Sequence, residues 1–368
     1  MLEGYDVRGV GSISILHVIF LSMTVIGLKN HVTIIPPLLH VVGRDGWASV
    51  IFAAVAIVPW LFLLVYIHQK SDQAPIKDWL KSVIGGTGST IVLYITGIYL
   101  TLLAAFTMVE TLKWVNTTFL PKTPMIMMLI IYIILCMLLV STNIQTIAMV
   151  NVIVLFGVII LGFFVAIVNI QVKDYELLLP IFEHGFQPVL KGMVYPASGF
   201  VELLLLLFLQ HHFKDRIRWY HFVLLLFILT GLTIGPLVGA ITEFGPVEAA
   251  KQRYPAYEEW GLVSIGRYIE HLDFFSIYQW LTGVFIRVGF ILFVVADLLN
   301  MTNKKKRIWV LLAPAFFVIC LLLFLLSESL FLEIKRNYFL LSNYFFFFLL
   351  SLFLASVGLV AGKTSKKT

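Results

Sequence analysis

Long apolar runs separated by short polar gaps dominate the chain. A run of about 20 apolar residues is long enough to cross the hydrocarbon core of a bilayer as an α-helix. The gaps carry turn residues, as in Gly43-Arg44-Asp45-Gly46 and Pro121-Lys122-Thr123-Pro124. The pattern predicts one polytopic, all-α integral membrane domain over residues 1–368 with ten transmembrane helices. The expected spans are 12–42, 47–68, 89–112, 124–142, 145–170, 187–213, 219–243, 274–299, 307–327 and 337–361.

Two of these spans are interrupted near their middle. The first contains Val25-Ile26-Gly27-Leu28-Lys29-Asn30-His31, and the sixth contains Tyr195-Pro196-Ala197-Ser198-Gly199. Unwound backbone is tolerated at membrane depth only where it is buried in protein or lines a cavity. A pair of Gly/Pro-interrupted spans is also the best sequence pointer to a transporter-type binding site. We therefore expect unwound backbone and a ligand site where these two spans break.

Composition supports a membrane protein. Hydrophobic residues make up 60% of the chain and charged residues 12%, whereas soluble domains have about 45–50% and about 25%. The spans leave no room for a large soluble domain. Cys136 and Cys320 both lie inside apolar runs, so they indicate neither a disulfide framework nor a metal site. We expect the bilayer as a partner and no nucleic acid.

The distribution of basic residues predicts the orientation. The net charge is +6, and lysine and arginine gather in the tails and in alternate loops, most densely at Lys304-Lys305-Lys306-Arg307. Ten spans place both termini on the same side. Because cytoplasmic loops carry an excess of basic residues, we expect both termini in the cytoplasm.

Charged residues inside the spans are candidates for function, since such charges are rare in a bilayer. Arg287 lies about 15 Å from each end of its span, at 1.5 Å rise per residue, and needs an acidic partner, a cage of carbonyls, a water-filled cavity or an anionic ligand. Glu202 is similarly deep and is a candidate to pair with Arg287, to bind a ligand amine or to relay a proton. Lys29 lies closer to an interface and is expected to snorkel. Glu110, beside Lys113, is expected to be a boundary residue.

Motifs for catalysis are absent from the sequence: it contains no GxSxG, HExxH, Walker or CxxC pattern. We expect no enzyme activity and no cofactor. His211-His212 lies in a polar loop beside Lys214, where metal binding is conceivable, but the pair alone does not support it. We therefore expect no metal.

In sequence, the chain resembles the permease-like B subunits of bacterial spore germinant receptors, which belong to the amino acid–polyamine–organocation superfamily. The resemblance covers nearly the whole chain and rests on the order and spacing of several motifs. These are 118–124 (Thr-Phe-Leu-Pro-Lys-Thr-Pro), Tyr195-Pro196 through Gly199 to Glu202-Leu203, Phe244-Gly245-Pro246, Tyr254-Pro255-Ala256-Tyr257, residues 265–273, and Trp280 through Gly283 to Arg287.

This resemblance implies a LeuT-like fold of two inverted five-helix repeats, with broken helices one and six. It implies a subunit of the spore inner membrane that binds a small nutrient, such as an amino acid, and that assembles with A-type and C-type receptor subunits. The ligand pocket would lie at the two breaks, between spans three and eight, and the span-three residues are chosen by register alone. The implied ligand-binding residues are Gly27, Leu28, Asn30, Thr101, Ala105, Tyr195, Ala197, Ser198, Gly199, Glu202, Thr282, Gly283 and Arg287.

Two other functions stay open at this point. A proton- or sodium-coupled amino-acid transporter would show the same broken spans and buried charges. A structural membrane subunit without a working pocket would keep the kinks as architecture. Ligand binding of any kind separates the first two functions from the third, and substrate uptake separates the transporter from the receptor subunit.

Overall fold

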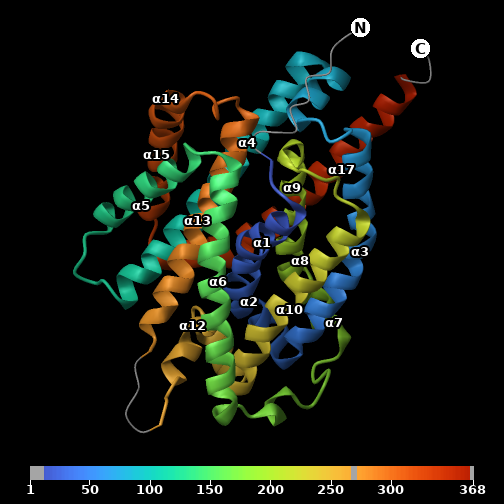
Figure 1. Ribbon diagram of the computed structural model, residues 1–368. Helices are drawn as coiled ribbons and strands as arrows, with labels where there is room; N and C mark the ends of the chain where they lie inside the picture. Colours follow the sequence, from blue (N-terminus) through green and yellow to red (C-terminus); the bar gives the residue numbers. More distant parts are fainter. Residues whose placement is uncertain (1–11, 267–271, 365–368) are drawn as a thin grey trace.

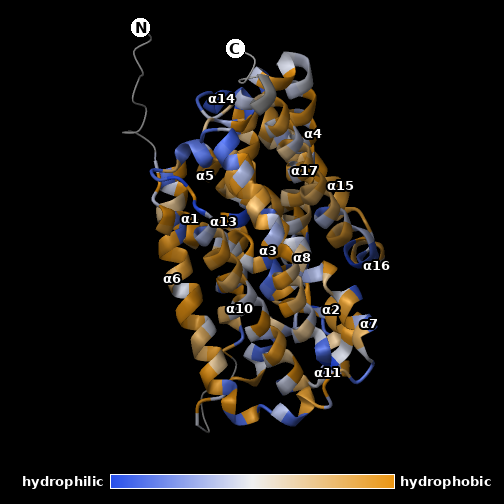
Figure 2. Ribbon diagram, turned by 90° about the vertical axis from the view of Figure 1, so that its right-hand side faces the viewer, coloured by the Kyte–Doolittle hydropathy of each residue, from blue (hydrophilic) through white to orange (hydrophobic). Residues whose placement is uncertain are grey.

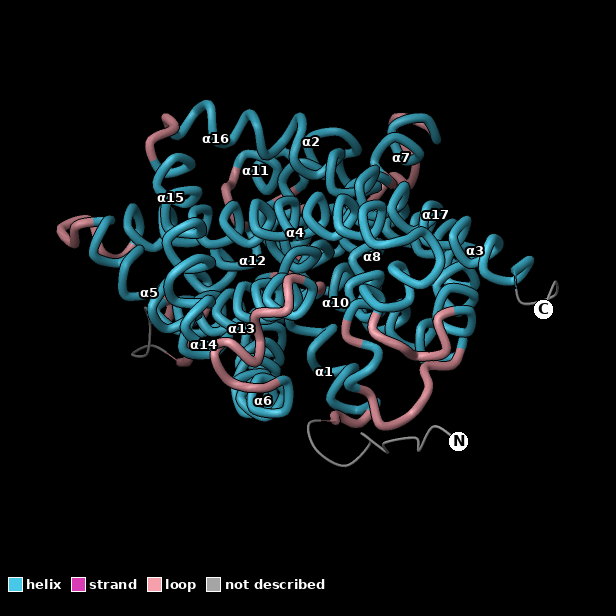
Figure 3. The backbone as a smooth tube through the Cα atoms, turned by 90° about the horizontal axis from the view of Figure 1, so that it is seen from above, coloured by secondary structure: helices cyan, strands magenta, loops and turns pink. Residues whose placement is uncertain are grey.

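The computed structural model describes residues 12–266 and 272–364, which form a bundle of helices without a strand (Figures 1 and 3). Ile13 and Phe213 form an isolated β-bridge. Residues 267–271, part of the motif at 265–273, lie outside the described residues, as do residues 1–11 and 365–368. The all-helical prediction is confirmed for the described part of the chain.

The α-helices are α1 (Ile15–Val25), α2 (Ile35–Val42), α3 (Gly46–Lys70), α4 (Ile76–Thr118), α5 (Met125–Val140), α6 (Ile144–Val168), α7 (Phe186–Gly192), α8 (Val194–Phe200), α9 (Leu205–Phe208), α10 (Trp219–Phe244), α11 (Pro246–Lys251), α12 (Pro255–Glu258), α13 (Phe274–Leu298), α14 (Lys305–Arg307), α15 (Ala313–Phe324), α16 (Glu328–Ile334) and α17 (Leu340–Thr364). Short 3-10 segments are η2 (Gly43–Asp45), η3 (Asn169–Val172), η4 (Tyr175–Leu178), η5 (Val201–Leu204), η6 (Gln210–His212) and η7 (Glu259–Leu262). Short π-helical segments are η1 (Lys29–Thr33), η8 (Ile308–Leu312) and η9 (Lys335–Phe339).

Among the described residues, nine helical segments are long and apolar enough to cross a membrane. The predicted span at 124–142 corresponds to α5, which is apolar but has 16 residues and is shorter than these nine. Hydrophobic residues predominate along the helices at the flanks of the bundle, for example along α6 (Figure 2). In the most apolar 18-residue stretch of α13, 83% of the residues are buried. This helix is therefore the centre of the bundle, packed between α4, α5 and α6.

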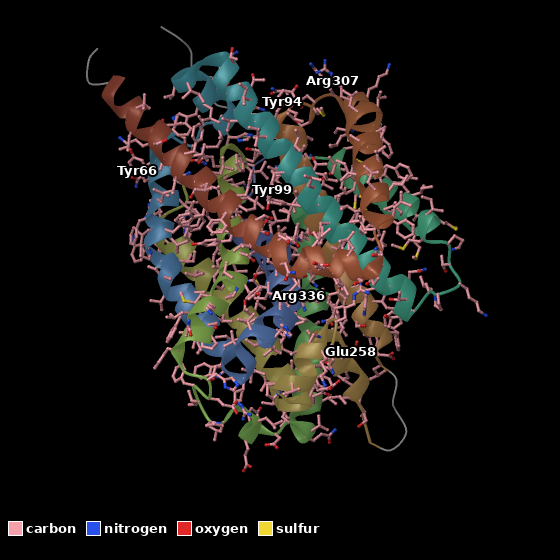
Figure 4. All side chains as sticks on the ribbon, turned by 180° about the vertical axis from the view of Figure 1, so that it is seen from behind. Tyr66, Tyr94, Tyr99, Glu258, Arg307 and Arg336 are labelled. Atoms are coloured by element: carbon pink, nitrogen blue, oxygen red, sulfur yellow. The ribbon has the colours of Figure 1, made fainter. Side chains whose placement is uncertain are left out.

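Both ends of the described chain lie at one end of the bundle (Figure 1). Arg307, labelled in Figure 4, lies at this same end, which we call the basic end. The backbone just before α1 is tied there to the loop after η6, because the Ile13 amide donates to the His212 carbonyl at 2.8 Å and the Lys214 amide to the Ile13 carbonyl at 3.0 Å. Segments α11 and α12 lie toward the opposite end.

The two predicted breaks are changes of helical winding, and the expectation of unwound backbone was wrong for this structure. Ile26, Leu28 and Ile34 all keep right-handed helical dihedral angles around the π-helical η1. The Tyr195–Gly199 stretch is itself part of helix α8, which tightens into the 3-10 segment η5. Short π and 3-10 segments inside α-helices often mark functional sites, so both positions remain candidates for the ligand site.

Helix α4 bends sharply at Gly85, whose φ of +78° lies in the left-handed region. Glycine populates this region at little cost because it has no Cβ. The bend separates a first part, residues 76–84, from the long second part that contains the predicted span 89–112. The first part carries Lys77, whose ammonium hydrogen-bonds the Asp297 carbonyl of α13 at 3.0 Å.

Candidate ligand-binding site

Glu202 is the centre of a buried ion cluster, formed with Lys29 and Arg287. The ammonium of Lys29 donates to Glu202 Oε1 at 3.0 Å. The guanidinium of Arg287 donates to both carboxylate oxygens, from Nη1 to Oε2 at 2.7 Å and from Nη2 to Oε1 at 3.1 Å. All three residues are at most 3% exposed. With all three ionised, the cluster carries a formal charge of +1.

The predicted pairing of Glu202 with Arg287 is thereby confirmed. The expectation that Lys29 snorkels to an interface was wrong. Lys29 lies in the π-helical η1, where the wider winding shifts the direction of its side chain relative to a regular helix. Its ammonium pairs with the Glu202 carboxylate and donates to the Ser198 carbonyl inside the bundle. The side chain therefore does not extend to the membrane surface.

Backbone carbonyls of the distorted helices take part in the cluster. The Ser198 carbonyl accepts from Lys29 Nζ at 2.9 Å, and the Val25 carbonyl accepts from Arg287. Where a helix tightens from i−4 to i−3 hydrogen bonds, or widens, carbonyls become available to side-chain donors. The irregular winding therefore supplies acceptors that help to hold the two cations in a low-dielectric interior.

Asn343 of α17 belongs to the cluster and was missed by sequence reasoning. Its Nδ2 donates to the Ser198 carbonyl at 2.6 Å and to Glu202 Oε1 at 3.1 Å. The Tyr99 hydroxyl donates to Asn343 Oδ1 at 3.1 Å, where α4 crosses α17 (Figure 4). An isolated amide in an apolar span is itself a signal of function, so Asn343 could have been found.

Gly199 lets the two distorted helices approach closely. A Cβ atom at this position would lie 1.8 Å from Asn30 Oδ1, so any substitution would force the Asn30 side chain out of its place. Asn30 is fully buried and donates from Nδ2 to the Pro196 carbonyl at 3.3 Å. Asn30, Ser198, Gly199, Glu202 and Arg287 are thus brought together from the implied ligand-binding set.

Other members of that set lie at the edge of the cluster or away from it. Leu28 packs against Gly283, where a Cβ atom would lie 3.1 Å from Leu28 Cδ1, and Gly27 faces α10. Thr101 and Thr282 donate their hydroxyls to carbonyls four residues earlier in their own helices. Ala105 and Ala197 are buried, and Tyr195 is half-buried.

A small cavity, with room for about one water molecule, lies beside the ion cluster. Its polar lining comes from Lys29 and Thr33 of η1, Arg287 of α13, and Thr107, Glu110 and Thr111 of α4. Thr107 and Thr111 come later along α4 than Thr101 and Ala105, which were chosen from span three by register alone. The cavity combines two cations, one carboxylate and three hydroxyls.

Four aromatic side chains pack together where Trp280 lines the cavity, and we call them the aromatic cap: Trp114, Tyr254, Tyr257 and Trp280. Ring centroids are 4.4 Å apart for Trp114–Trp280, 4.3 Å for Tyr254–Trp280 and 4.7 Å for Tyr257–Trp280. All four are buried, and Trp280 also lines the cavity. Tyr257 lies in the short helix α12 and Tyr254 directly precedes it, so the segment between α10 and α13 supplies two of the four rings, and we call residues 254–258 the lid.

A second buried ion pair connects the cap to the cavity. Glu110 Oε1 lies 2.6 Å from Lys335 Nζ and accepts from the Tyr254 hydroxyl at 3.0 Å. Glu110 and Lys335 are 3% and 5% exposed. The expectation that Glu110 is a boundary residue was therefore wrong, because Lys335 of η9 and the lid bury it.

A pair of carboxyl groups lies where the segment after α12 packs on α10. Glu259 of η7 lies against Gly239 of α10. Gly239 is one helical turn before Glu243 in α10. Asn169 Nδ2 donates to Glu243 Oε2 and to the Glu259 carbonyl, both at 2.8 Å, and Lys173 Nζ lies 3.5 Å from Glu243 Oε1. Burial raises the pKa of Glu259 well above its ordinary value; the neighbouring Glu243 carboxylate adds to this, and Lys173 opposes it.

We expect the thermal stability of the protein to fall as pH rises from about 4.5 through the raised pKa of Glu259. A raised pKa means that the folded state binds this proton more tightly than the unfolded state, so the stabilisation is complete below the unfolded pKa and is lost above the folded one. Unfolding temperatures across a pH series should fall less steeply in Glu259→Gln than in wild type. The exposed Glu248→Gln should behave as wild type; equal slopes for all three proteins would contradict the expectation.

Comparison with known proteins is consistent with these features. A family model described as "Spore germination protein" matches residues 12–330. The chain is 43% identical to "Spore germination protein XB" of Bacillus anthracis over 330 residues, covering 89% of this chain and 92% of that protein. It is 24% identical to "Putative spore germination protein YfkT" of Bacillus subtilis, strain 168, over 80% of this chain and 81% of that protein. It is 23% identical to "Spore germination protein A2" of the same strain, over 54% and 55%.

Proposed function

This chain belongs to the spore germination protein family, and from that membership we propose that it is the permease-like membrane subunit of a germinant receptor and binds a small nutrient at the central ion cluster. The observation that carries the ligand site is the buried Lys29–Glu202–Arg287 cluster where the two distorted helices meet. Charges within membrane spans are costly and usually functional. Binding there would shift the bundle between two states, and the shift would be the signal.

The proposed ligand is an amino acid. With its three groups ionised, the cluster has one positive charge in excess, and Lys29 and Arg287 both line the cavity, so a ligand carboxylate there would be attracted by that charge. The Glu110 carboxylate lines the same cavity and suits an ammonium group. Because the cavity in this structure holds about one water molecule, binding requires that its walls, or the aromatic cap above it, move.

The wider setting follows from the family resemblance. We propose that the bundle is LeuT-like, built from two inverted five-helix repeats in which the distorted helices over 12–42 and 187–213 correspond. The basic end would face the cytoplasm by the positive-inside rule, with both termini there and the aromatic cap outside. The subunit would lie in the spore inner membrane with A-type and C-type receptor subunits.

Ligand-dependent thermal stability of the purified protein tests the proposal. Among amino acids, nucleosides and sugars, one ligand class should raise the unfolding temperature, since binding stabilises by about 2.7 kcal/mol at a hundredfold excess over Kd. The shift should disappear in Arg287→Ala and persist in Arg307→Ala, an exposed arginine at the basic end.

The structural subunit and the coupled transporter are distinguished from the receptor by the same thermal-stability assay together with uptake into vesicles. No shift with any compound, with the partner subunits present, would support a structural subunit without a working pocket. A shift accompanied by substrate-dependent uptake into vesicles would support a coupled transporter. A shift that survives in Arg287→Ala would place the ligand away from the ion cluster.

A further inference from the structure

A cluster of metal-ligating side chains lies at the basic end, away from the ion cluster. It consists of His211 and His212 of η6 and Asp297 near the end of α13. The ligand atoms of these three residues all lie within 4.8 Å of one another. His211 Nε2 is 3.5 Å from Asp297 Oδ2, and the two imidazole rings have centroids 4.1 Å apart and are tilted by 40° to each other.

The sequence alone showed only the histidine pair; the fold supplies the third ligand from a distant helix. The Asp297 side chain is 7% exposed and the His211 side chain 17%, so the cluster is shielded yet open to one side. Two imidazoles and one carboxylate are preferred ligands of zinc and of other borderline divalent transition metals. From this arrangement we propose that His211, His212 and Asp297 bind one divalent transition-metal ion, with zinc as the probe.

The geometry requires only small adjustments. Nitrogen and oxygen ligands lie about 2.0–2.2 Å from zinc, so ligand atoms of one tetrahedral site are about 3.5 Å apart. Side-chain rotations that bring the three atoms together by about an ångström are sufficient. Asp297 would bind through Oδ2, because its Oδ1 faces Lys77 Nζ at 3.6 Å.

Lys77 provides a second, independent test of the proposal, because it shares Asp297 with the proposed site. Its ammonium belongs to the first part of α4 and shares Asp297 with the site, so it repels a divalent cation and lowers the affinity for it. A metal site therefore predicts that Lys77→Ala binds zinc more tightly than wild type. A simple His211–Asp297–Lys77 ion-pair network predicts no zinc binding in either protein.

A bound ion would join two elements that also carry the central cluster. Segment η6 ends the distorted helix that includes Glu202, and α13 carries Arg287. The metal would hold the ends of these elements together at the basic end while the opposite end carries the aromatic cap. Its role would be to fix one end of the bundle during the proposed change of state.

Zinc binding to the full-length protein in detergent, after treatment with a chelator, tests the inference by calorimetry and by metal analysis after dialysis. We expect about one saturable zinc ion per chain. His211→Ala and His212→Ala should each weaken binding by more than the roughly 10- to 100-fold cost of losing an outer-shell partner. His221→Ala is the matched control, because this histidine lies in α10 and is not part of the cluster. Its Nδ1 accepts from the backbone amide of Arg218 at 3.0 Å.

The outcomes are decisive in either direction. Stoichiometric binding that is lost in both histidine variants, kept in His221→Ala and tightened in Lys77→Ala supports the site. Absence of saturable binding, or binding unchanged in His212→Ala, overturns it. The measurement needs no nutrient ligand, so it stands or falls separately from the proposed receptor function.

Discussion

Glu202→Ala is expected to lower the free energy of unfolding by about 3–5 kcal/mol, the cost typical of breaking a buried ion pair on one side. The reason is the shared carboxylate: without it, Lys29 and Arg287 remain as two buried cations with no acidic partner in the cluster. Arg287→Ala and Lys29→Ala should cost less, because each leaves one complete ion pair. Thermal unfolding of the purified proteins gives the order.

A second substitution distinguishes loss of the charge partner from loss of packing. Adding Lys29→Met to Glu202→Ala removes one unpaired cation, so the double variant should be more stable than Glu202→Ala alone. Glu333→Ala, on the exposed face of α16, controls for the removal of any carboxylate. If Glu202→Ala unfolds at the same temperature as Arg287→Ala, the cluster is not organised around Glu202.

Tyr257→Ala is expected to open the aromatic cap and expose the cavity to reagents from outside. Tyr257 stacks on Trp114 and Trp280, at 5.2 Å and 4.7 Å between centroids. At about 0.5–1.5 kcal/mol per aromatic pair, the closed state loses about 1–3 kcal/mol. That difference corresponds to a roughly 5- to 150-fold larger open population.

The measurement is the rate at which a membrane-impermeant thiol reagent labels Thr107→Cys, which places a thiol in the cavity. The native cysteines, Cys136 and Cys320, are both buried and free and would be replaced by alanine in the background. Labelling should be slow with the cap intact and faster with Tyr257→Ala. The matched control is Tyr175→Ala, an exposed tyrosine of η4; equal rates for Tyr257→Ala and this control would show that the cap does not close the cavity.

The sequence predicted the membrane class, the two irregular helices and the Glu202–Arg287 pair. These features depend on composition, on local Gly/Pro chemistry and on the rule that a deep charge needs a partner. Asn343 carried a comparable signal, a lone amide in an apolar run. It lies in the last helix, however, and nothing local shows which helix that amide faces.

Lys29 and Glu110 show what local reasoning lacks. Their depth was judged from distance along a straight span, but burial depends on which neighbours cover a residue. The π-helical η1 directs Lys29 to Glu202, and the lid with η9 encloses Glu110. Pairing between distant helices and the register between them are tertiary properties, which explains why the residues chosen from span three were displaced along α4 from those lining the cavity.

The excess positive charge of the central cluster has an electrical consequence. With Lys29, Glu202 and Arg287 all ionised, a net charge is held deep inside a bundle that spans the membrane. Moving one unit charge across the whole membrane at a potential of 100 mV changes its electrostatic energy by about 2.3 kcal/mol. If the proposed change of state carries the cluster along the membrane normal, it gains or loses a fraction of that energy, so its midpoint is expected to shift with membrane voltage and depolarisation alone to change the populations of its two states.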